Sequence, residues 1–300
     1  MEENKTAETQ QEEMTASASD AQPQATQTAI EAKPVVPYQP VKVTLDALLS
    51  AGAHFGHKVE RWNPRMLPFI YGKKGGVHVI NLDITLDYWQ KTAPRIKEAA
   101  AQGKTFLFVG TKEQAGEVVK SAAERCGAFY INYRWLGGAL TNFQTIKRSI
   151  AKMDALEDLL KKADDDKSEV RLGKKEKLQI TRKLEKLSVN LGGIRKMRRI
   201  PDYIFIVDIN RDSIAVQEAR KLHVPVIALV DTNSDPTFVD LPIPTNDDSR
   251  RAIELFVNAV ADQVAAGVKE AVKQKEKKVK LDKKPVKAKA AAAAVHASPS

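Results

Sequence analysis

Three short and almost unbroken apolar runs constrain the fold of this chain more than any other feature of its sequence. They are FLFVG at residues 106–110, YIFIVDI at 203–209 and PVIALV at 225–230. Continuous apolar runs of this length are typical of strands that are covered on both faces, as the strands of a parallel sheet are. The runs therefore predict a buried parallel sheet.

Helical patterns alternate with strand patterns from residue 77 onward. The predicted strands are Val77–Leu82, Thr105–Gly110, Ala128–Asn132, Tyr203–Ile209, Pro225–Val230 and Leu241–Pro244. The predicted helices are Thr85–Gln102, Lys112–Cys126, Asp212–Leu222 and Ser249–Val268. Asp212 and the pair Asp247 and Asp248 stand where N-terminal caps are expected. Strand–helix–strand repetition of this length predicts an α/β fold with an open, doubly wound sheet.

The alternation stops between residues 142 and 200, where no strand pattern occurs. Two helical stretches there flank a polar middle, Asp164–Lys177, and each has apolar residues at spacings of three and four. The first stripe is Ile146, Ile150, Met153, Leu156 and Leu160, and the second is Ile180, Leu184, Leu187 and Leu191. Two facing stripes of this kind predict an inserted antiparallel helical hairpin, close to a coiled coil.

The two ends of the chain lack the large apolar side chains that a packed core requires. Residues 1–41 are rich in Gln, Thr, Ala, Glu and Pro, and residues 269–300 are rich in Lys and Ala. Such segments cannot bury enough apolar surface to offset the loss of chain entropy, so we expect both to be disordered. The remaining residues, 42–268, are predicted to form one α/β core that the hairpin at 142–200 interrupts.

Charge is distributed unevenly along the chain, whose formal net charge is +10. The net charge is −5 for residues 1–41, +6 for 42–141, +8 for 142–200, −6 for 201–268 and +7 for 269–300. Basic segments of this kind predict a polyanionic partner, of which nucleic acid is the most common. The acidic segment is expected to face a protein partner or solvent, or to lie against the basic part of the same fold.

A membrane surface is the competing polyanion, and the sequence does not favour it. No apolar run approaches the roughly 20 residues that a spanning helix needs, and the acidic N-terminal segment has no signal-peptide pattern. The single cysteine, Cys126, excludes an intrachain disulfide and is typical of a reducing cytosol. These features predict a cytoplasmic protein without a membrane partner.

Two glycine-containing segments resemble phosphate-binding motifs, but neither is complete. Gly103-Lys104-Thr105 lacks the first P-loop glycine, because Glu98 occupies that position, and it precedes a strand. Residues 110–116 follow a strand and open a helix, yet they do not form GxGxxG. With no nucleophile elbow either, we predict a non-enzymatic protein without a cofactor. The alternatives are a nucleotide-binding α/β enzyme with basic appendages and an RNA chaperone that binds through its tails.

Acidic residues gather near the carboxyl ends of two predicted strands, where ligands of such sheets usually bind. Asp208, Asp231 and Asp235 are candidates for holding Mg²⁺, although capping and turn roles explain them as well. His54 and His57 are spaced so that they can share one helical face and bind zinc. Further ligands are not apparent in the sequence. We therefore interpret both as structural histidines or as contacts to RNA or a partner.

Several motifs occur in the order and spacing of a known family. LLSAGAHFGHK begins at residue 48 and RWNPRM at 61. FVGTK follows at 108, RWLGGALTNF at 134, LGGI at 191 and VDTNSDP at 230. Together, between about residues 43 and 266, they resemble the bacterial small-subunit ribosomal protein S-two family.

The resemblance implies a flavodoxin-like α/β domain interrupted by a helical hairpin. It implies a structural constituent of the small ribosomal subunit that binds 16S rRNA at the head–body junction, on the solvent side. It also implies a role in docking the OB-repeat ribosomal protein that captures messenger RNA. Neighbouring small-subunit proteins are the other implied partners, a homo-oligomer is not expected, and any Mg²⁺ is that of the ribosome.

Positively charged residues in and beside these motifs are the predicted phosphate contacts. They are Arg61, Arg65, Lys73, Lys74, Arg134, Lys147, Arg148, Arg195, Lys196, Arg198 and Arg199. Further candidates for contacts to RNA or a partner are His54, His57, Trp62, Trp135 and Asn142. For each tryptophan, core packing is an equally good interpretation. Arg198 and Arg199 replace a glycine pair that is usual in the family, so side chains stand where that backbone is free to take positive φ.

Overall fold

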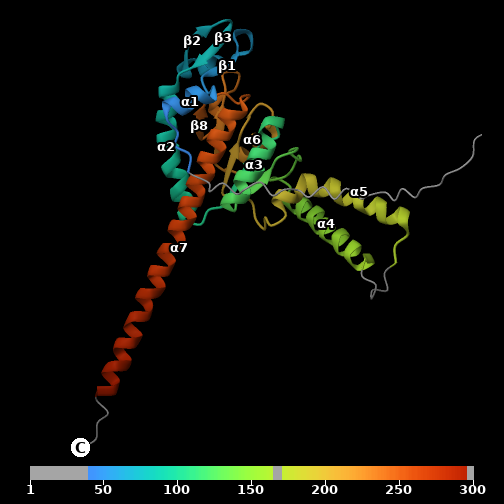
Figure 1. Ribbon diagram of the computed structural model, residues 1–300, viewed down its shortest axis with the longest axis vertical. Helices are drawn as coiled ribbons and strands as arrows, with labels where there is room; N and C mark the ends of the chain where they lie inside the picture. The colour runs from blue at the N-terminus through green and yellow to red at the C-terminus, as the bar shows by residue number, and fades with distance from the viewer. Residues whose placement is uncertain (1–39, 165–170, 296–300) are drawn as a thin grey trace, which may run out of the picture. The chain divides into compact units, whose positions relative to one another are not determined.

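A five-stranded parallel sheet forms the centre of the protein (Figure 1). The structure is a computed structural model that describes residues 40–164 and 171–295, with side chains described up to residue 274. The strand order is β5-β4-β6-β7-β8. The strands are β4 (Phe106–Val109), β5 (Phe129–Ile131), β6 (Tyr203–Ile206), β7 (Val226–Val230) and β8 (Leu241–Pro244). All pairings are parallel, as the apolar runs predicted.

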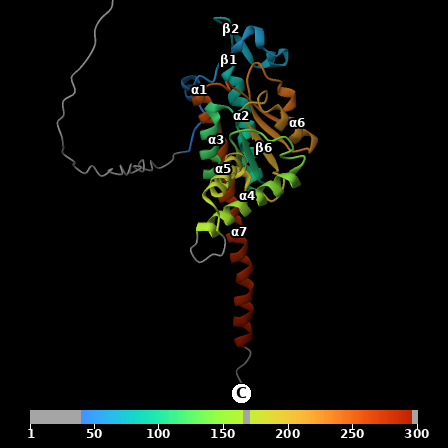
Figure 2. The same cartoon turned by 90° about the vertical axis from the view of Figure 1, so that its right-hand side faces the viewer.

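Both faces of this sheet are covered, which explains why its central strands are apolar throughout (Figure 2). One face packs against α2 (Leu82–Ala101), α3 (Glu113–Cys126) and α7 (Arg250–Val295). The other face packs against α6 (Ser213–Lys221) and the segment that leads into the hairpin. Alternate residues of one strand serve the two faces, so Phe106 and Phe108 belong to the first core and Leu107 and Val109 to the second.

The segment before the parallel sheet forms structure that the sequence analysis did not predict. Helix α1 (Leu45–Ala51) is followed by three antiparallel strands in the order β1-β3-β2. These strands are β1 (Phe55–Lys58), β2 (Ile70–Lys74) and β3 (Val77–Ile80). The predicted strand at Val77–Leu82 therefore exists, but it was wrong to place it in the α/β alternation. The turn between β2 and β3 is Gly75-Gly76, and both residues have positive φ, which suits a two-residue hairpin turn.

The inserted segment forms two helices, α4 (Phe143–Asp164) and α5 (Lys174–Leu191), which contact each other (Figure 1). Residues 165–170 of the predicted polar middle lie outside the described part. The inner end of the first stripe does not pack only against α5, because Ile146, Ile150 and Met153 belong to the second core of the sheet. The coiled-coil geometry stays a prediction.

The last helix continues past the predicted end at Val268 and reaches Val295. Residues 269–295 of the segment predicted to be disordered have a helical backbone, and residues 296–300 lie outside the described part. Lys, Ala, Glu and Gln are strong helix formers, and a helix that is already nucleated can extend through such a sequence. The leader at 1–39 lies outside the described residues. Within the described residues, no helix is both long and apolar enough to cross a bilayer.

Candidate functional site

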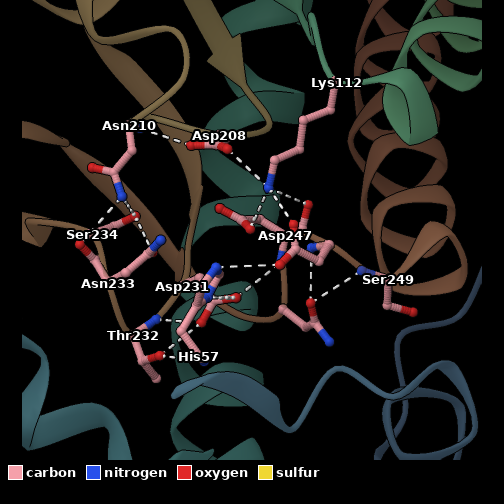
Figure 3. Close-up of polar contacts among 12 residues, drawn as sticks. His57, Lys112, Asp208, Asn210, Asp231, Thr232, Asn233, Ser234, Asp247 and Ser249 are labelled. Atoms are coloured by element: carbon pink, nitrogen blue, oxygen red, sulfur yellow. Dashed lines mark hydrogen bonds and ion pairs between the residues drawn. The ribbon is translucent and has the colours of Figure 1, made fainter. Parts of the chain in front are cut away.

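A polar cluster lies at the carboxyl ends of the parallel strands, inside the protein (Figure 3). Lys112 follows β4, Asp208 follows β6, Asp231 follows β7 and Asp247 follows β8. Strands of a parallel sheet end at the same edge, so residues far apart in the sequence meet there. His57, from β1 of the antiparallel sheet, completes the cluster.

Lys112 is the central cation of this cluster. Its Nζ lies 2.9 Å from Asp208 Oδ2, 2.7 Å from Asp247 Oδ1 and 2.8 Å from Asp248 Oδ1. Burial by itself lowers the pKa of Lys112, but the charge of Asp247 and the hydrogen bonds to Asp247, Asp248 and Asp208 raise the pKa overall. The ammonium group therefore stays charged. Acidic residues of 201–268 thus pair with the basic part of the same fold, one of the three arrangements expected for that segment.

His57 joins the antiparallel sheet to the cluster. Its Nδ1 lies 3.1 Å from Asp231 Oδ2 and its Nε2 lies 3.3 Å from Asp248 Oδ2. The hydrogen bond to Asp231 raises the pKa of His57, against the effect of burial. The strand can approach this closely because its neighbour is Gly56, where a Cβ would lie 2.5 Å from Thr232 Cγ2.

Asp247 is the least satisfied acid of the cluster. Its side chain is fully buried, and its Oδ2 has no hydrogen-bond partner among the described residues. Burial, reinforced by the charges of Asp231 and Asp208, raises the pKa of Asp247 to about 7. One donor atom each of His57, Asp231 and Asp247 lies within 4.8 Å of the others, a grouping that can hold a metal ion.

The acids that the sequence suggested for a metal are only partly brought together. Asp231 joins His57 and Asp247, while Asp208 lies on the far side of Lys112. Asp235 points elsewhere, since its carboxylate pairs with Arg65 and accepts a hydrogen bond from Thr237 N. Asp247 was assigned only a capping role from the sequence. Its proximity to His57 has no local signal, because 190 positions separate the two residues.

Three of the predicted phosphate contacts form ion pairs within the chain. Arg65 pairs with Asp235. Arg195 Nη2 lies 2.6 Å from Asp154 and 2.7 Å from Glu157, which ties the end of the hairpin to α4. Arg199 Nη2 lies 3.1 Å from Asp202 Oδ2. These arginines therefore hold neighbouring segments together through ion pairs, in addition to contributing positive charge to the surface.

The other predicted contacts have no ion pair among the described residues. Lys147 Nζ lies 5.1 Å from the centroid of the Phe143 ring. The remaining seven are exposed, and they are Arg61, Lys73, Lys74, Arg134, Arg148, Lys196 and Arg198. No residue of 195–200 has positive φ, so the Arg198-Arg199 pair fits a turn that does not require glycine.

The aromatic and polar candidates differ in their surroundings. Trp135 is only 7% exposed, which favours the core-packing interpretation. Trp62 is half-buried, and its ring lies 5.0 Å from the ring of His78. The rings of His54 and Phe55 lie 4.0 Å apart. Asn142 is exposed and its Oδ1 accepts a hydrogen bond from Thr145 Oγ1.

A buried glutamate that the sequence analysis missed holds the 135–141 loop in place. The Glu218 carboxylate, from α6, accepts hydrogen bonds from the backbone N–H groups of Gly138, Leu140 and Thr141 at 2.7–3.0 Å. Trp135 Nε1 and Thr141 Oγ1 also donate to it. Burial opposes ionisation, but these donors together lower the pKa of Glu218. A glutamate on the same helical face as Ala215 and Ala219 is the signal that could have identified it.

Comparison with known proteins identifies the relatives of this chain. Residues 48–267 match the family described as Ribosomal protein S2. Small ribosomal subunit protein uS2 of Campylobacter lari is 50% identical over 225 residues, which cover 75% of this chain and 85% of that protein. The corresponding protein of Campylobacter fetus is 49% identical with coverage of 75% and 86%, and that of Helicobacter acinonychis is 48% identical with coverage of 75% and 90%.

Proposed function

Because this chain belongs to the Ribosomal protein S2 family, we propose that its exposed cations bind 16S rRNA at the head–body junction of the small subunit, on the solvent side. Membership makes the protein a non-enzymatic structural constituent of the small ribosomal subunit, and hence a component of the cytoplasmic ribosome that acts in translation. What remains to be assigned is which surfaces make the contacts.

The observation that carries the proposal is the exposure of cations that the fold does not neutralise. Lys73 and Lys74 stand at the Gly75-Gly76 turn of the antiparallel sheet, and Arg148 and Arg198 stand at the inner end of the hairpin. Lysine and arginine bind phosphate through charge and hydrogen bonds, and such contacts position a protein on RNA without reading its sequence. We assign the coiled-coil hairpin to the same role, as a basic extension that lies along RNA.

A salt series tests this assignment. The variant Lys73→Gln, Lys74→Gln, Arg148→Gln, Arg198→Gln removes four proposed contacts. The control variant Lys221→Gln, Arg251→Gln, Lys269→Gln, Lys273→Gln removes four other exposed cations and has the same net charge. Binding of each full chain to small subunits depleted of this protein is measured by sedimentation between 50 and 300 mM KCl, a range chosen because counterion release is pronounced there.

The first variant should bind more weakly and its salt slope should fall by roughly 3, since each phosphate contact contributes about 0.7–0.9 to that slope. The control should follow the unmodified chain. Equal behaviour of the two variants would place the RNA contacts elsewhere on the molecule.

The proposal includes docking of the OB-repeat protein that captures messenger RNA. Large apolar side chains remain exposed around the antiparallel sheet, among them Phe55, Leu67 and Tyr71. Aromatic residues in such positions are enriched at protein interfaces. Purified OB-repeat protein should bind subunits carrying Tyr71→Ala more weakly than subunits carrying the unmodified chain. If both bind it equally, that side chain is not part of the contact.

A second assignment concerns the buried cluster, where the unpartnered Oδ2 of Asp247 favours a bound cation. One imidazole and two carboxylates suit Zn²⁺ better than Mg²⁺, which prefers oxygen ligands alone. Metal analysis of the full chain purified with zinc should give one equivalent, which His57→Ala should abolish. His54→Ala is the matched control from the same motif. Retention of zinc in both variants, or its absence in the unmodified chain, would refute the assignment.

A further inference from the structure

An open cleft of about 870 Å³ lies at the same edge of the sheet, beside the buried cluster. Its walls are the segments that follow β4, β5 and β6, together with the first turns of α3. Since β5 and β6 lie on either side of β4, their loops form two sides of the cleft. Open α/β sheets bind ligands at this position, where successive connections leave in opposite directions.

The cleft exposes side chains that the folding of the sheet does not explain. Tyr133, after β5, is 62% exposed and Ile214, at the start of α6, is 55% exposed. Arg134 is exposed next to Tyr133, and Arg211 is exposed on the β6 side. An exposed ring with guanidinium groups around it is the combination that protein surfaces use to stack a nucleobase and bind its phosphate.

One wall of the cleft is held rigidly in place. Trp135, two positions after Tyr133, donates to Glu218, whose carboxylate also fixes the three backbone N–H groups that follow. On the other side of Tyr133, Asn132 packs so closely on α3 that a Cβ on Gly116 would lie 2.8 Å from its carbonyl oxygen. A site that is already formed avoids the entropic cost of ordering when it binds.

The charges of the cleft are mixed, which distinguishes it from a plain phosphate site. Lys120, Arg134 and Arg211 provide donors for a phosphate. Glu113 and Glu117, on the first turns of α3, provide acceptors for ribose hydroxyls or for the amino groups of a base. A nucleotide has a phosphate for these donors, hydroxyl or amino groups for these acceptors, and a base with an apolar face. An isolated phosphate can use only the donors.

We propose that this cleft binds a single unstacked nucleotide, with its base on the Tyr133 ring and its phosphate at Arg134. One source of such a nucleotide is an extruded residue of 16S rRNA, and for this source the proposal rests on the proposed function. A free nucleoside monophosphate has the same chemistry and is the other source.

Two variants of Tyr133 separate stacking from other effects. Tyr133→Ala removes the ring and Tyr133→Phe keeps it, and both are made in the full chain. One arm measures binding to small subunits depleted of this protein. The other arm measures binding of AMP, GMP, CMP and UMP by isothermal titration calorimetry.

If the nucleotide belongs to rRNA, Tyr133→Ala should weaken binding to subunits by roughly 5- to 100-fold, and Tyr133→Phe should restore it, as expected for the loss of one stacked base. If the nucleotide is free, at least one monophosphate should bind the unmodified chain and fail to bind the alanine variant, with subunit binding unchanged. Either result supports the cleft.

The proposal is overturned if Tyr133→Ala changes neither measurement, or if alanine and phenylalanine cause equal losses. Failure of the proposed function gives a different result, in which the unmodified chain itself does not bind the depleted subunits. The calorimetric arm does not depend on that binding.

Discussion

The two halves of one sheet edge use the same kinds of residue in opposite ways. In the buried cluster, Lys112 after β4 and His57 on β1 are enclosed and paired with four aspartates from the segments after β6, β7 and β8. On the β5 side, Arg134 and Tyr133 are exposed in an open cleft, and no ion pair involving Arg134 occurs among the described residues. The closed half, which is the cluster around Lys112 and His57, joins the two sheets. The open half, which is the cleft at Tyr133 and Arg134, leaves its cations available to bind phosphate.

The difference follows from the cost of burying charge. An unpaired charge in a low-dielectric interior is so unfavourable that a buried cation must have counter-charges within the fold. Lys112 meets this requirement with three carboxylates from two loops, those that follow β6 and β8. A cation that the fold leaves in solvent has no such requirement and can exchange water for a phosphate. Net charge alone therefore does not locate a binding surface, because some of it is used for folding.

The largest expected effect is loss of the buried cation. Lys112→Met should lower the free energy of unfolding by about 3–5 kcal/mol, because it leaves the carboxylates of Asp208 and Asp247 without their counter-charge. Lys120→Met is the matched control on α3, the helix that begins directly after Lys112, and it should change stability by less than about 0.5 kcal/mol because Lys120 is exposed. Urea denaturation at pH 7 measures the free energy of unfolding of both variants. Equal losses would mean that the buried cation is no more important for folding than the exposed one.

Removing the negative charge of Glu218 should have the next largest effect. Glu218→Gln keeps the size of the side chain but replaces one acceptor oxygen with an NH₂ group facing N–H donors. We expect a loss of about 2–4 kcal/mol at pH 7 by urea denaturation. Because the folded protein lowers the pKa of Glu218, its contribution is fully present above about pH 4.5 and is lost as the pH falls through the folded value. If the difference in unfolding free energy between Glu218→Gln and the unmodified chain did not shrink in acid, the result would contradict the role of the carboxylate.

Long apolar patterns predicted the parallel sheet because burial on both faces leaves few alternatives. The runs at 203–209 and 225–230 contain strands β6 and β7 in the structure. Strands β1 and β2 of the antiparallel sheet escaped prediction because they contain Gly56, Gly72 and several polar residues, and so lack a continuous apolar run. The end of α7 was misplaced for a different reason, since Lys- and Ala-rich sequence is compatible with both a helix and a disordered segment.

The candidate site was less predictable because its members are close only in three dimensions. The sequence identified His57 and Asp231 as unusual, but their contact joins positions 174 apart. The sequence allowed two interpretations of Trp135, and its burial together with its hydrogen bond to Glu218 favours the core. Exposure of Tyr133 could not be predicted from the sequence, because the residue lies two positions from each of the buried residues Ile131 and Trp135.

A carboxylate on the border between the halves should show a smaller effect of opposite sign. Burial raises the pKa of Asp212 to about 6, although Thr111 donates hydrogen bonds to it. The folded state therefore favours the protonated acid, and stability is lost as the pH rises from the ordinary pKa of 3.8 through the folded value of about 6. Asp212→Asn should raise the free energy of unfolding by on the order of 2 kcal/mol at pH 7.5 and leave it nearly unchanged at pH 4. Urea denaturation at the two pH values checks this, and a gain of equal size at both would rule out ionisation as the cause.

The smallest effect is expected at the exposed ring of the cleft. Tyr133→Ala should change the free energy of unfolding by less than about 0.5 kcal/mol, because the side chain is mostly in solvent. Trp135→Phe, two residues away, should cost about 1–3 kcal/mol because it leaves one acceptor site of the Glu218 carboxylate without its donor. Thermal and urea unfolding of the two variants compare the exposed Tyr133 with the buried Trp135 on the same loop. A large destabilisation by Tyr133→Ala would mean that the ring supports the fold, and the open half would then resemble the closed one.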